Sequence, residues 1–99
     1  MYAIRFARDT ATDLKKIKPY YRQRILDEID NQLSSEPTTP TEHRKQLMDL
    51  VPPWPAEPPI WQLSVGDYRV FYDVDEGEAT VYVRAVREKP AGKTTEEIL

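Results

Sequence analysis

The sequence contains no cysteine, which excludes disulfide bridges, thiolate metal sites and a cysteine nucleophile. It also lacks any apolar run near the ~20 residues that are needed to span a bilayer. The first residues have no apolar stretch of the kind that a signal peptide requires. We therefore expect a protein of the reducing cytoplasm with no membrane partner.

What is present fits one globular domain that spans residues 1–99. Apolar residues make up 39% of the chain and charged residues 31%, which is typical of a folded protein. The net charge of −3 argues by itself against a general nucleic-acid binder. The charge is uneven, however, because residues 1–24 carry seven basic and two acidic side chains. This segment can attract phosphate or an acidic partner, although a solvated helix face is the simpler interpretation.

The N-terminal part of the chain predicts a strand followed by two helices. Residues 2–6 alternate between apolar and other side chains, which indicates a half-buried strand. Thr10 and Asp13 have the spacing of a capping box and predict a helix over residues 10–17. A second helix is predicted over residues 19–34, because proline suits its first turn and apolar residues then recur at every fourth position. The short connection favours an antiparallel helical hairpin.

Residues 36–59 form a proline-rich connecting segment that holds most of the nine prolines. Proline removes a backbone donor, so we expect irregular structure rather than sheet, around a helix-permissive stretch at 41–50. The segment is long for a connection in a small domain. Such a segment is either functional or poorly ordered.

The C-terminal half predicts strands. Apolar and polar residues alternate over residues 60–65, 68–74 and 81–86, which indicates a three-stranded antiparallel meander. Gly66-Asp67 is a two-residue turn with glycine first, as a type II′ turn prefers.

These elements predict an α+β fold with one sheet. An N-terminal strand precedes the α-helical hairpin and the meander, and residues 93–99 form a short C-terminal helix, capped by Thr94 or Thr95, or a frayed tail. The hairpin should cover the apolar face of the meander. The first strand should join the sheet beside the last strand or along an edge.

Several strings occur in a recognisable order along the chain. Residues 61–72 read WQLSVGDYRVFY, and residues 2–6, 13–17, 45–47 and 81–89 supply further matches. Together they resemble the RelE/ParE toxin superfamily of bacterial type II toxin–antitoxin pairs, whose hairpin reads W-x-L-x-V-G-D-Y-R-V-x-Y. The resemblance implies a RelE/ParE-like fold over nearly the whole chain. RelE-like members cleave mRNA in the ribosomal A site without a metal or other cofactor, ParE-like members inhibit DNA gyrase, and an antitoxin neutralises both.

The resemblance also implies a site. Arg69, Arg87 and Lys89 would be catalytic, with Lys45 and Arg84 binding the substrate. Metal-free RNA cleavage needs such cations, because negative charge grows on the phosphoryl oxygens when a 2′-hydroxyl attacks.

Two positions depart from the RelE-like pattern. Ile60 and Gln62 stand where some members have lysines, and residues 94–96 read TTE where some have a tyrosine. The usual base and the usual stacking aromatic are therefore missing from these places, which favours a protein that only binds.

Three other residues have alternative interpretations. His43, the single histidine, is an alternative base, but a solvated loop histidine is simpler because nothing in the sequence fixes its distance to Arg69. Asp73 shares a strand face with Arg69, and a cross-strand ion pair with Arg84 is as good an explanation as a catalytic role. Trp54 lies between prolines and either packs on the domain or anchors a partner, packing being the safer prediction.

Two functions are therefore open. The first is a ribosome-dependent mRNA endoribonuclease that inhibits translation and is held silent by its antitoxin. The alternative is a ParE-like gyrase inhibitor, or a catalytically lapsed homologue that only binds its antitoxin. On the predicted helices, Lys15, Lys16 and Arg22 are the expected antitoxin contacts.

Overall fold

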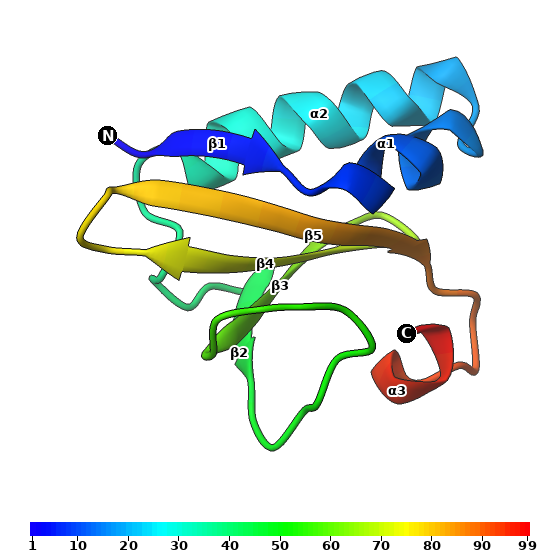
Figure 1. Cartoon of the computed structure of the whole chain (residues 1–99). Helices are drawn as coiled ribbons and strands as arrows, with labels where there is room; N and C mark the ends of the chain where they lie inside the picture. Colours follow the sequence, from blue (N-terminus) through cyan, green and yellow to red (C-terminus); the bar gives the residue numbers. More distant parts are fainter.

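The computed structural model describes residues 1–99 and confirms the α+β class (Figure 1). One sheet has the strand order β1-β5-β4-β3-β2, and two helices lie on one of its faces. The elements in chain order are β1 (Ala3–Phe6), α1 (Arg8–Lys15), α2 (Pro19–Leu33), β2 (Arg44–Leu47), β3 (Ile60–Val65), β4 (Tyr68–Asp75), β5 (Thr80–Glu88) and α3 (Thr95–Ile98). No helix is both long and apolar enough to cross a membrane.

The strands β3, β4 and β5 form the predicted antiparallel meander. β1 pairs in parallel with β5, with Ala3 opposite Thr80, so the first strand lies beside the last as expected. Gly66, between β3 and β4, has a φ of 57°, whereas Asp67 stays outside the left-handed region. This combination agrees with the predicted type II′ turn, which places glycine first.

The expectation of irregular structure over residues 36–59 is wrong at β2. Arg44–Leu47 pairs antiparallel with β3, and Arg44 lies opposite Leu63. This stretch is free of proline and forms the outer strand, so it needs hydrogen-bond partners on one side only. The sheet therefore has one strand more than the sequence analysis predicts.

The helix α1 does not begin with the predicted capping box. It starts at Arg8, and its N-cap residue makes no side-chain hydrogen bond. The hydroxyl of Thr10 donates instead to the carbonyl of Val83 (3.0 Å), and the carboxylate of Asp13 accepts from the backbone N–H of Val86 (3.1 Å). Thr10 docks α1 on β5 at Val83, where the pairing with β1 ends, and Asp13 docks it on the stretch beyond. Tertiary partners therefore replace the local cap.

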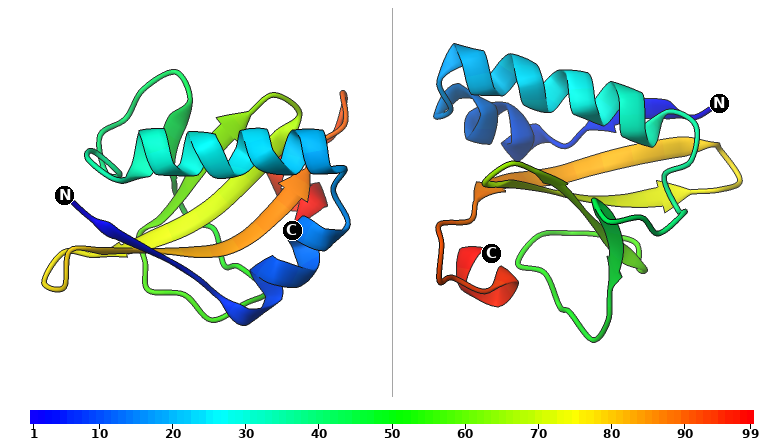
Figure 2. Two further views of the ribbon diagram at one scale, coloured as in Figure 1. Left: turned by 90° about the horizontal axis from the view of Figure 1, so that it is seen from above. Right: turned by 180° about the vertical axis from the view of Figure 1, so that it is seen from behind.

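The helix α2 follows its predicted apolar stripe from Pro19 onward. Ile25, Ile29 and Leu33 are at most 1% exposed and share one core cluster with strand residues. The helix lies across one face of the sheet (Figure 2). Packing of this stripe against alternate strand residues removes the apolar surface of both layers from water. The strand residues of this core are Trp61, Leu63, Val65, Val70, Tyr72, Val81, Val83 and Val86.

The opposite face of the sheet is covered in part by the chain between β2 and β3 and by α3 (Figures 1 and 2). Trp54 packs on Phe71 with ring centroids 5.5 Å apart, and the Arg87 guanidinium lies 5.6 Å from the Trp54 ring centre. The packing prediction for Trp54 is thus confirmed. On α3, the Thr95 hydroxyl donates to the Gln62 side-chain oxygen (3.0 Å).

Candidate functional site

The sheet face opposite the helices gathers polar side chains near the β3–β4 turn. Ser64 of β3 lies opposite Arg69 of β4, which lies opposite Arg87 of β5. Two residues before Ser64 on β3, Gln62 lies opposite Lys45 of β2. Because side chains alternate across a strand, these five residues leave the sheet on the same face.

A cavity of about 190 Å³, here called the cationic cavity, lies at this end of the face and has no apolar side chain in its lining. Strands, the segment after β5 and α3 all contribute to it. Its lining residues are Thr41, Glu42, His43, Arg44, Lys45, Gln62, Ser64, Arg69, Lys89 and Thr95. Three residues of the predicted site, from three separate parts of the chain, therefore share one cavity.

Four cations of the lining have no carboxylate partner. One of them, Arg44, is 6% exposed and donates to the carbonyls of Gln32 and Glu36, which leaves three that are open to a ligand. Lys45, Arg69 and Lys89 form no ion pair, although the chain as a whole has a net charge of −3. The acid of the lining is Glu42, and its carboxylate lies 3.3 Å from the Nε2 atom of His43. Uncompensated positive charge in a concave site attracts anions, because one anion can neutralise several cations at once.

The turn between β3 and β4 holds the Arg69 side chain in place. Its Nη1 atom donates to the carbonyls of Gly66 and Tyr68, both at 2.8 Å. The Nε and Nη2 atoms make no hydrogen bond within the protein, so they are available to an oxyanion. The backbone N–H of Lys89 donates to the Asp67 carbonyl (2.6 Å), which ties the segment after β5 to the same turn.

His43 lies at the rim of the cationic cavity, one residue before β2. Its carbonyl accepts from the backbone N–H of Ser64 (2.8 Å). The Thr41 hydroxyl accepts from the N–H groups of His43 and Arg44, both at 3.1 Å. Strand pairing thus continues to His43, so that His43, Ser64 and Arg69 lie side by side on three neighbouring strands. The sequence alone does not reveal this arrangement.

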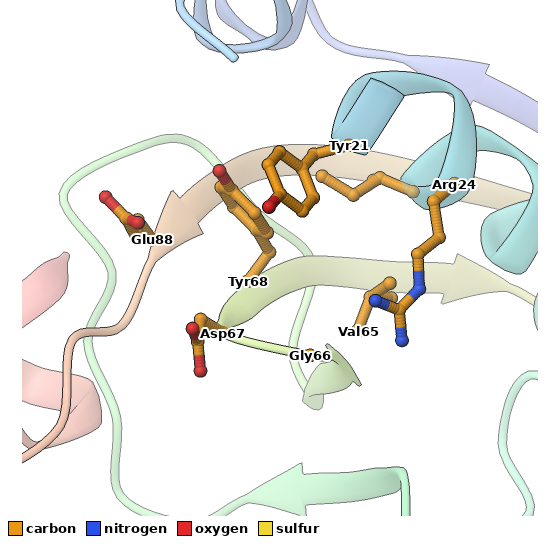
Figure 3. Close-up of a pocket in the computed structure, with 8 residues that line it drawn as sticks. Tyr21, Arg24, Val65, Gly66, Asp67, Tyr68 and Glu88 are labelled. Atoms are coloured by element: carbon orange, nitrogen blue, oxygen red, sulfur yellow. The ribbon is translucent and has the colours of Figure 1, made fainter. Parts of the chain in front are cut away.

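A second cavity of about 220 Å³ lies on the helix side of the same turn (Figure 3). The rings of Tyr21 and Tyr68 are 5.9 Å apart, and the Arg24 guanidinium lies toward Gly66. Burial, and then the negative charge of Glu88, raises the pKa of Tyr68. This cavity lacks the convergence of unpaired cations that marks the first one, so the candidate site is the cationic cavity.

Comparison with known proteins decides the family. Residues 4–89 match the family model described as the ParE toxin of the type II toxin–antitoxin system parDE. The chain belongs to the ParE toxin family, within the RelE/ParE superfamily. It is the toxin of a type II toxin–antitoxin system. No curated protein sequence matches this ParE-family toxin.

Solved structures share the fold of this toxin. The RelBE2 toxin–antitoxin complex of Mycobacterium tuberculosis matches with a TM-score of 0.72 and 24% identity, over 89% of this chain and 98% of that one. The archaeal RelE–RelB complex of Pyrococcus horikoshii matches with a TM-score of 0.69 and 20% identity, over 94% and 98%. The isolated RelE toxin of E. coli matches with a TM-score of 0.70 and 16% identity, over 98% and 94%. At these identities the likeness concerns the fold alone.

Two predicted site residues of the toxin are engaged by carboxylates. Arg87 donates through Nη1 to Asp13 of α1 (2.5 Å) and does not line the cationic cavity. Arg84 donates to both oxygens of the buried Asp73 (2.7 and 3.0 Å), and this hydrogen-bonded contact raises the pKa of Arg84. The predicted cross-strand pair of Asp73 and Arg84 is therefore confirmed. The catalytic role expected for Arg87 and the substrate role expected for Arg84 stay predictions.

The predicted antitoxin contacts of the toxin differ in their surroundings. Lys15 and Lys16 are exposed. Arg22 instead donates from Nε to the Leu14 carbonyl (2.8 Å) and from Nη2 to the Ile17 carbonyl (2.9 Å). It thereby binds carbonyls at the end of α1 and in the short connection to α2.

Two contributions to the site are not evident from the sequence. Lys45 lies opposite Gln62 because β2 exists, and the prolines on both sides of β2 hide its strand pattern. Thr95 reaches Gln62 because α3 folds back over the sheet, and a seven-residue tail does not reveal its destination. Residues 43–47 read HRKQL and show no alternation of apolar and polar side chains, so this stretch carries no strand signal of its own.

Proposed function

We propose that this toxin is a metal-independent endoribonuclease that cleaves mRNA on the ribosome and thereby inhibits translation in the cytoplasm. The observation that supports the proposal best is the gathering of Lys45, Arg69 and Lys89 in one cavity without a carboxylate partner. A phosphodiester that is being attacked needs such an environment, because negative charge increases on its oxygens.

The chemistry assigns a task to each cation. The 2′-oxygen of the ribose attacks the adjacent phosphorus, and the bond to the 5′-oxygen breaks. The free Nε and Nη2 atoms of Arg69 form a fork that suits two phosphoryl oxygens. Lys45 and Lys89 add positive charge, and an ammonium can protonate the leaving 5′-oxygen. Because Lys45 lies opposite Gln62, β2 supplies an ammonium where β3 has none.

Primer extension on mRNA from a translating ribosome extract tests this proposal. We expect the purified toxin to produce cuts at the ribosomal A site, and Arg69→Ala to abolish them because the anchored guanidinium is lost. Arg5→Ala removes an exposed cation from β1, far from the cavity in the sheet order, and should cut like the wild type. Intact mRNA with the wild-type protein would contradict the proposal.

The alternative is inhibition of DNA gyrase without bond cleavage. The matching family model carries the ParE name, and carboxylates already engage Arg84 and Arg87, which leaves fewer cations for RNA. A supercoiling assay separates the two functions. Loss of gyrase supercoiling together with uncut mRNA would establish the alternative.

We also propose that an antitoxin binds along the free edge of β1. Phe6 is 45% exposed there, and an apolar groove of about 440 Å³ runs between β1 and α2. An unpaired strand edge beside an apolar groove suits an extended partner segment, whose acidic residues would contact Lys15 and Lys16. Co-expression with the product of the neighbouring reading frame tests this: Phe6→Asp should reduce co-purification, and unchanged co-purification would contradict it.

A further inference from the structure

We propose that His43 is the general base of the cationic cavity and removes the proton from the attacking 2′-hydroxyl. The inference rests on the proposed ribonuclease function and deepens it. It concerns removal of the 2′-hydroxyl proton. β3 offers no lysine for this step, because Ile60 and Gln62 stand where some RelE-like members have lysines. Three observations carry it: the composition of the lining, the fixed position of His43 and its contact with Glu42.

The composition of the lining leaves one suitable group. A general base must gain and lose a proton near the operating pH. Lysine and arginine side chains ordinarily keep their protons at neutral pH, and hydroxyl and amide side chains do not ionise there. Carboxylates, the class to which Glu42 belongs, ordinarily gain a proton only at acidic pH. Imidazole is the side chain that changes its protonation in this range, and His43 is the one histidine of the chain.

The position of His43 is fixed by strand pairing rather than by a loose loop. Its carbonyl bond to Ser64 and the two bonds to the Thr41 hydroxyl hold its backbone on both sides. Neighbouring strands are ~4.8 Å apart, so two strand steps separate His43 from Arg69 by about 10 Å between backbones. Side chains from both ends of such a row can reach one nucleotide between them.

Glu42 is the carboxylate that lies beside the imidazole. Its carboxylate lies 3.3 Å from Nε2 of His43, and the His43 side chain is 54% exposed, so substrate can reach it. An Nε2–H that faces a carboxylate leaves Nδ1 as the free acceptor. A carboxylate likewise accompanies the histidine of a catalytic triad, although there it binds Nδ1–H and Nε2 accepts the proton. Nδ1 is therefore the atom that accepts the proton.

The 2′-hydroxyl proton moves to Nδ1 of His43 while the 2′-oxygen forms its bond to phosphorus. The bond between phosphorus and the 5′-oxygen breaks, and that oxygen takes a proton from the ammonium of Lys45 or Lys89. The products are a 2′,3′-cyclic phosphate and a 5′-hydroxyl, and exchange with water returns His43 and the lysine to their starting states.

The charges around His43 are known from every element of the cavity. Glu42 precedes it in the chain, Lys45 comes from β2, Arg69 from β4 and Lys89 from the segment after β5. Arg44 of β2 also lines the cavity, with its guanidinium bonded to the carbonyls of Gln32 and Glu36. The strand β3 contributes the uncharged Gln62 and Ser64, and α3 contributes the uncharged Thr95. The cleavage rate should fall at acidic pH, because an imidazole that already carries the proton cannot accept another.

The experiment measures single-turnover cleavage of ribosome-bound mRNA across pH with the full-length wild type, His43→Gln and Arg69→Ala. We expect His43→Gln to lower the rate by about 10²–10⁴-fold and to abolish the fall at acidic pH. Affinity for a ribosome carrying a 2′-deoxy codon should not change, because this substrate lacks the hydroxyl that His43 acts on. Imidazole added to His43→Ala should restore part of the rate.

The outcomes are distinguishable. A His43→Gln rate close to that of the wild type, with Arg69→Ala inactive, would overturn the role of His43 and leave the ribonuclease proposal standing. A lower rate that keeps the wild-type pH profile would also overturn it, since the residue would then only position the substrate. No cleavage by the wild type would overturn both proposals.

Discussion

Arg69 on β4 and Arg84 on β5 show how the surroundings of a single guanidinium determine its part in this molecule. Arg84 donates from Nε and Nη2 to the carboxylate of Asp73, which is 0% exposed. This arginine therefore neutralises a buried carboxylate. Arg69 bonds to two backbone carbonyls, which fix its direction but leave its charge uncompensated. Arginines of similar appearance in sequence thus differ in their surroundings: Arg84 is structural, and Arg69 keeps its charge free for the proposed ligand.

Arg22 is also structural, and a substitution can test this. Arg22→Ala removes the donors from the carbonyls of Leu14 and Ile17, so we expect the free energy of unfolding to fall by about 1–2 kcal/mol in urea denaturation. Arg24→Ala, on the same helix and exposed, makes no such bonds and serves as the control. Equal losses in the two variants would show that Arg22 acts through general charge rather than as a cap.

Tyr72 predicts how stability depends on alkaline pH. Burial raises its pKa in the folded state, whereas an unfolded tyrosine ionises near pH ~10. The unfolded chain therefore releases a proton that the folded chain keeps. The contribution of Tyr72 to the free energy of unfolding is fully present below pH ~10. Above that pH it is lost at about 1.4 kcal/mol per pH unit.

The variant Tyr72→Phe isolates this effect. It removes the ionisable group and the hydrogen bond to the Pro37 carbonyl (2.6 Å). We expect a loss of about 1 kcal/mol at neutral pH and a shallower fall in stability above pH 10, measured by urea denaturation at each pH. A slope identical to that of the wild type would contradict this explanation.

At the scale of elements, local pattern was sufficient where an element's own side chains determine its structure. The apolar stripe of α2 and the alternation in β3, β4 and β5 predicted these elements, and Gly66 predicted the turn between two of them. β2 was missed because its pairing with β3 decides its conformation more than its composition does. The start of α1 was misjudged because Thr10 and Asp13 bind β5 instead of their own helix.

The same distinction applies to the candidate site. Arg69, Lys89 and Lys45 were predicted from the family resemblance and meet in one cavity. The partner of Arg87 was not foreseen, because Asp13 is 74 positions away in the chain and was assigned to a local cap. The place of His43 was not foreseen either, because it depends on the extension of β2.

The docking of α1 on β5 gives a prediction at this scale. Asp13→Ala leaves the Val86 N–H without its carboxylate acceptor and frees the side chain of Arg87. We expect the Val86 amide to exchange with deuterium faster than in the wild type, and global stability to fall by about 1–3 kcal/mol. Asp9→Asn, an exposed change on the same helix, is the control, and unchanged protection of Val86 in Asp13→Ala would contradict the docking role.

At the scale of the whole molecule, the net charge of −3 conceals a local positive site. Carboxylates pair with Arg84, Arg87, His43 and Lys93, whereas the three cations that face the cationic cavity stay unpaired. A concave surface lined by one sign of charge focuses the field and raises the local concentration of an oppositely charged ligand. Net charge alone would have argued against an RNA-directed function, and the spatial distribution of charge reverses that argument.

The most direct test of this account compares two triple variants with the same change in total charge. In Lys45→Gln/Arg69→Gln/Lys89→Gln the cavity loses its unpaired cations, whereas Arg5→Gln/Arg8→Gln/Lys18→Gln removes three exposed cations elsewhere. The measurement is the fraction of ribosome-bound mRNA that each purified protein cleaves, read by primer extension. We expect full cleavage by the second variant and none by the first. Equal cleavage by both variants, or none by the wild-type toxin, would contradict this expectation.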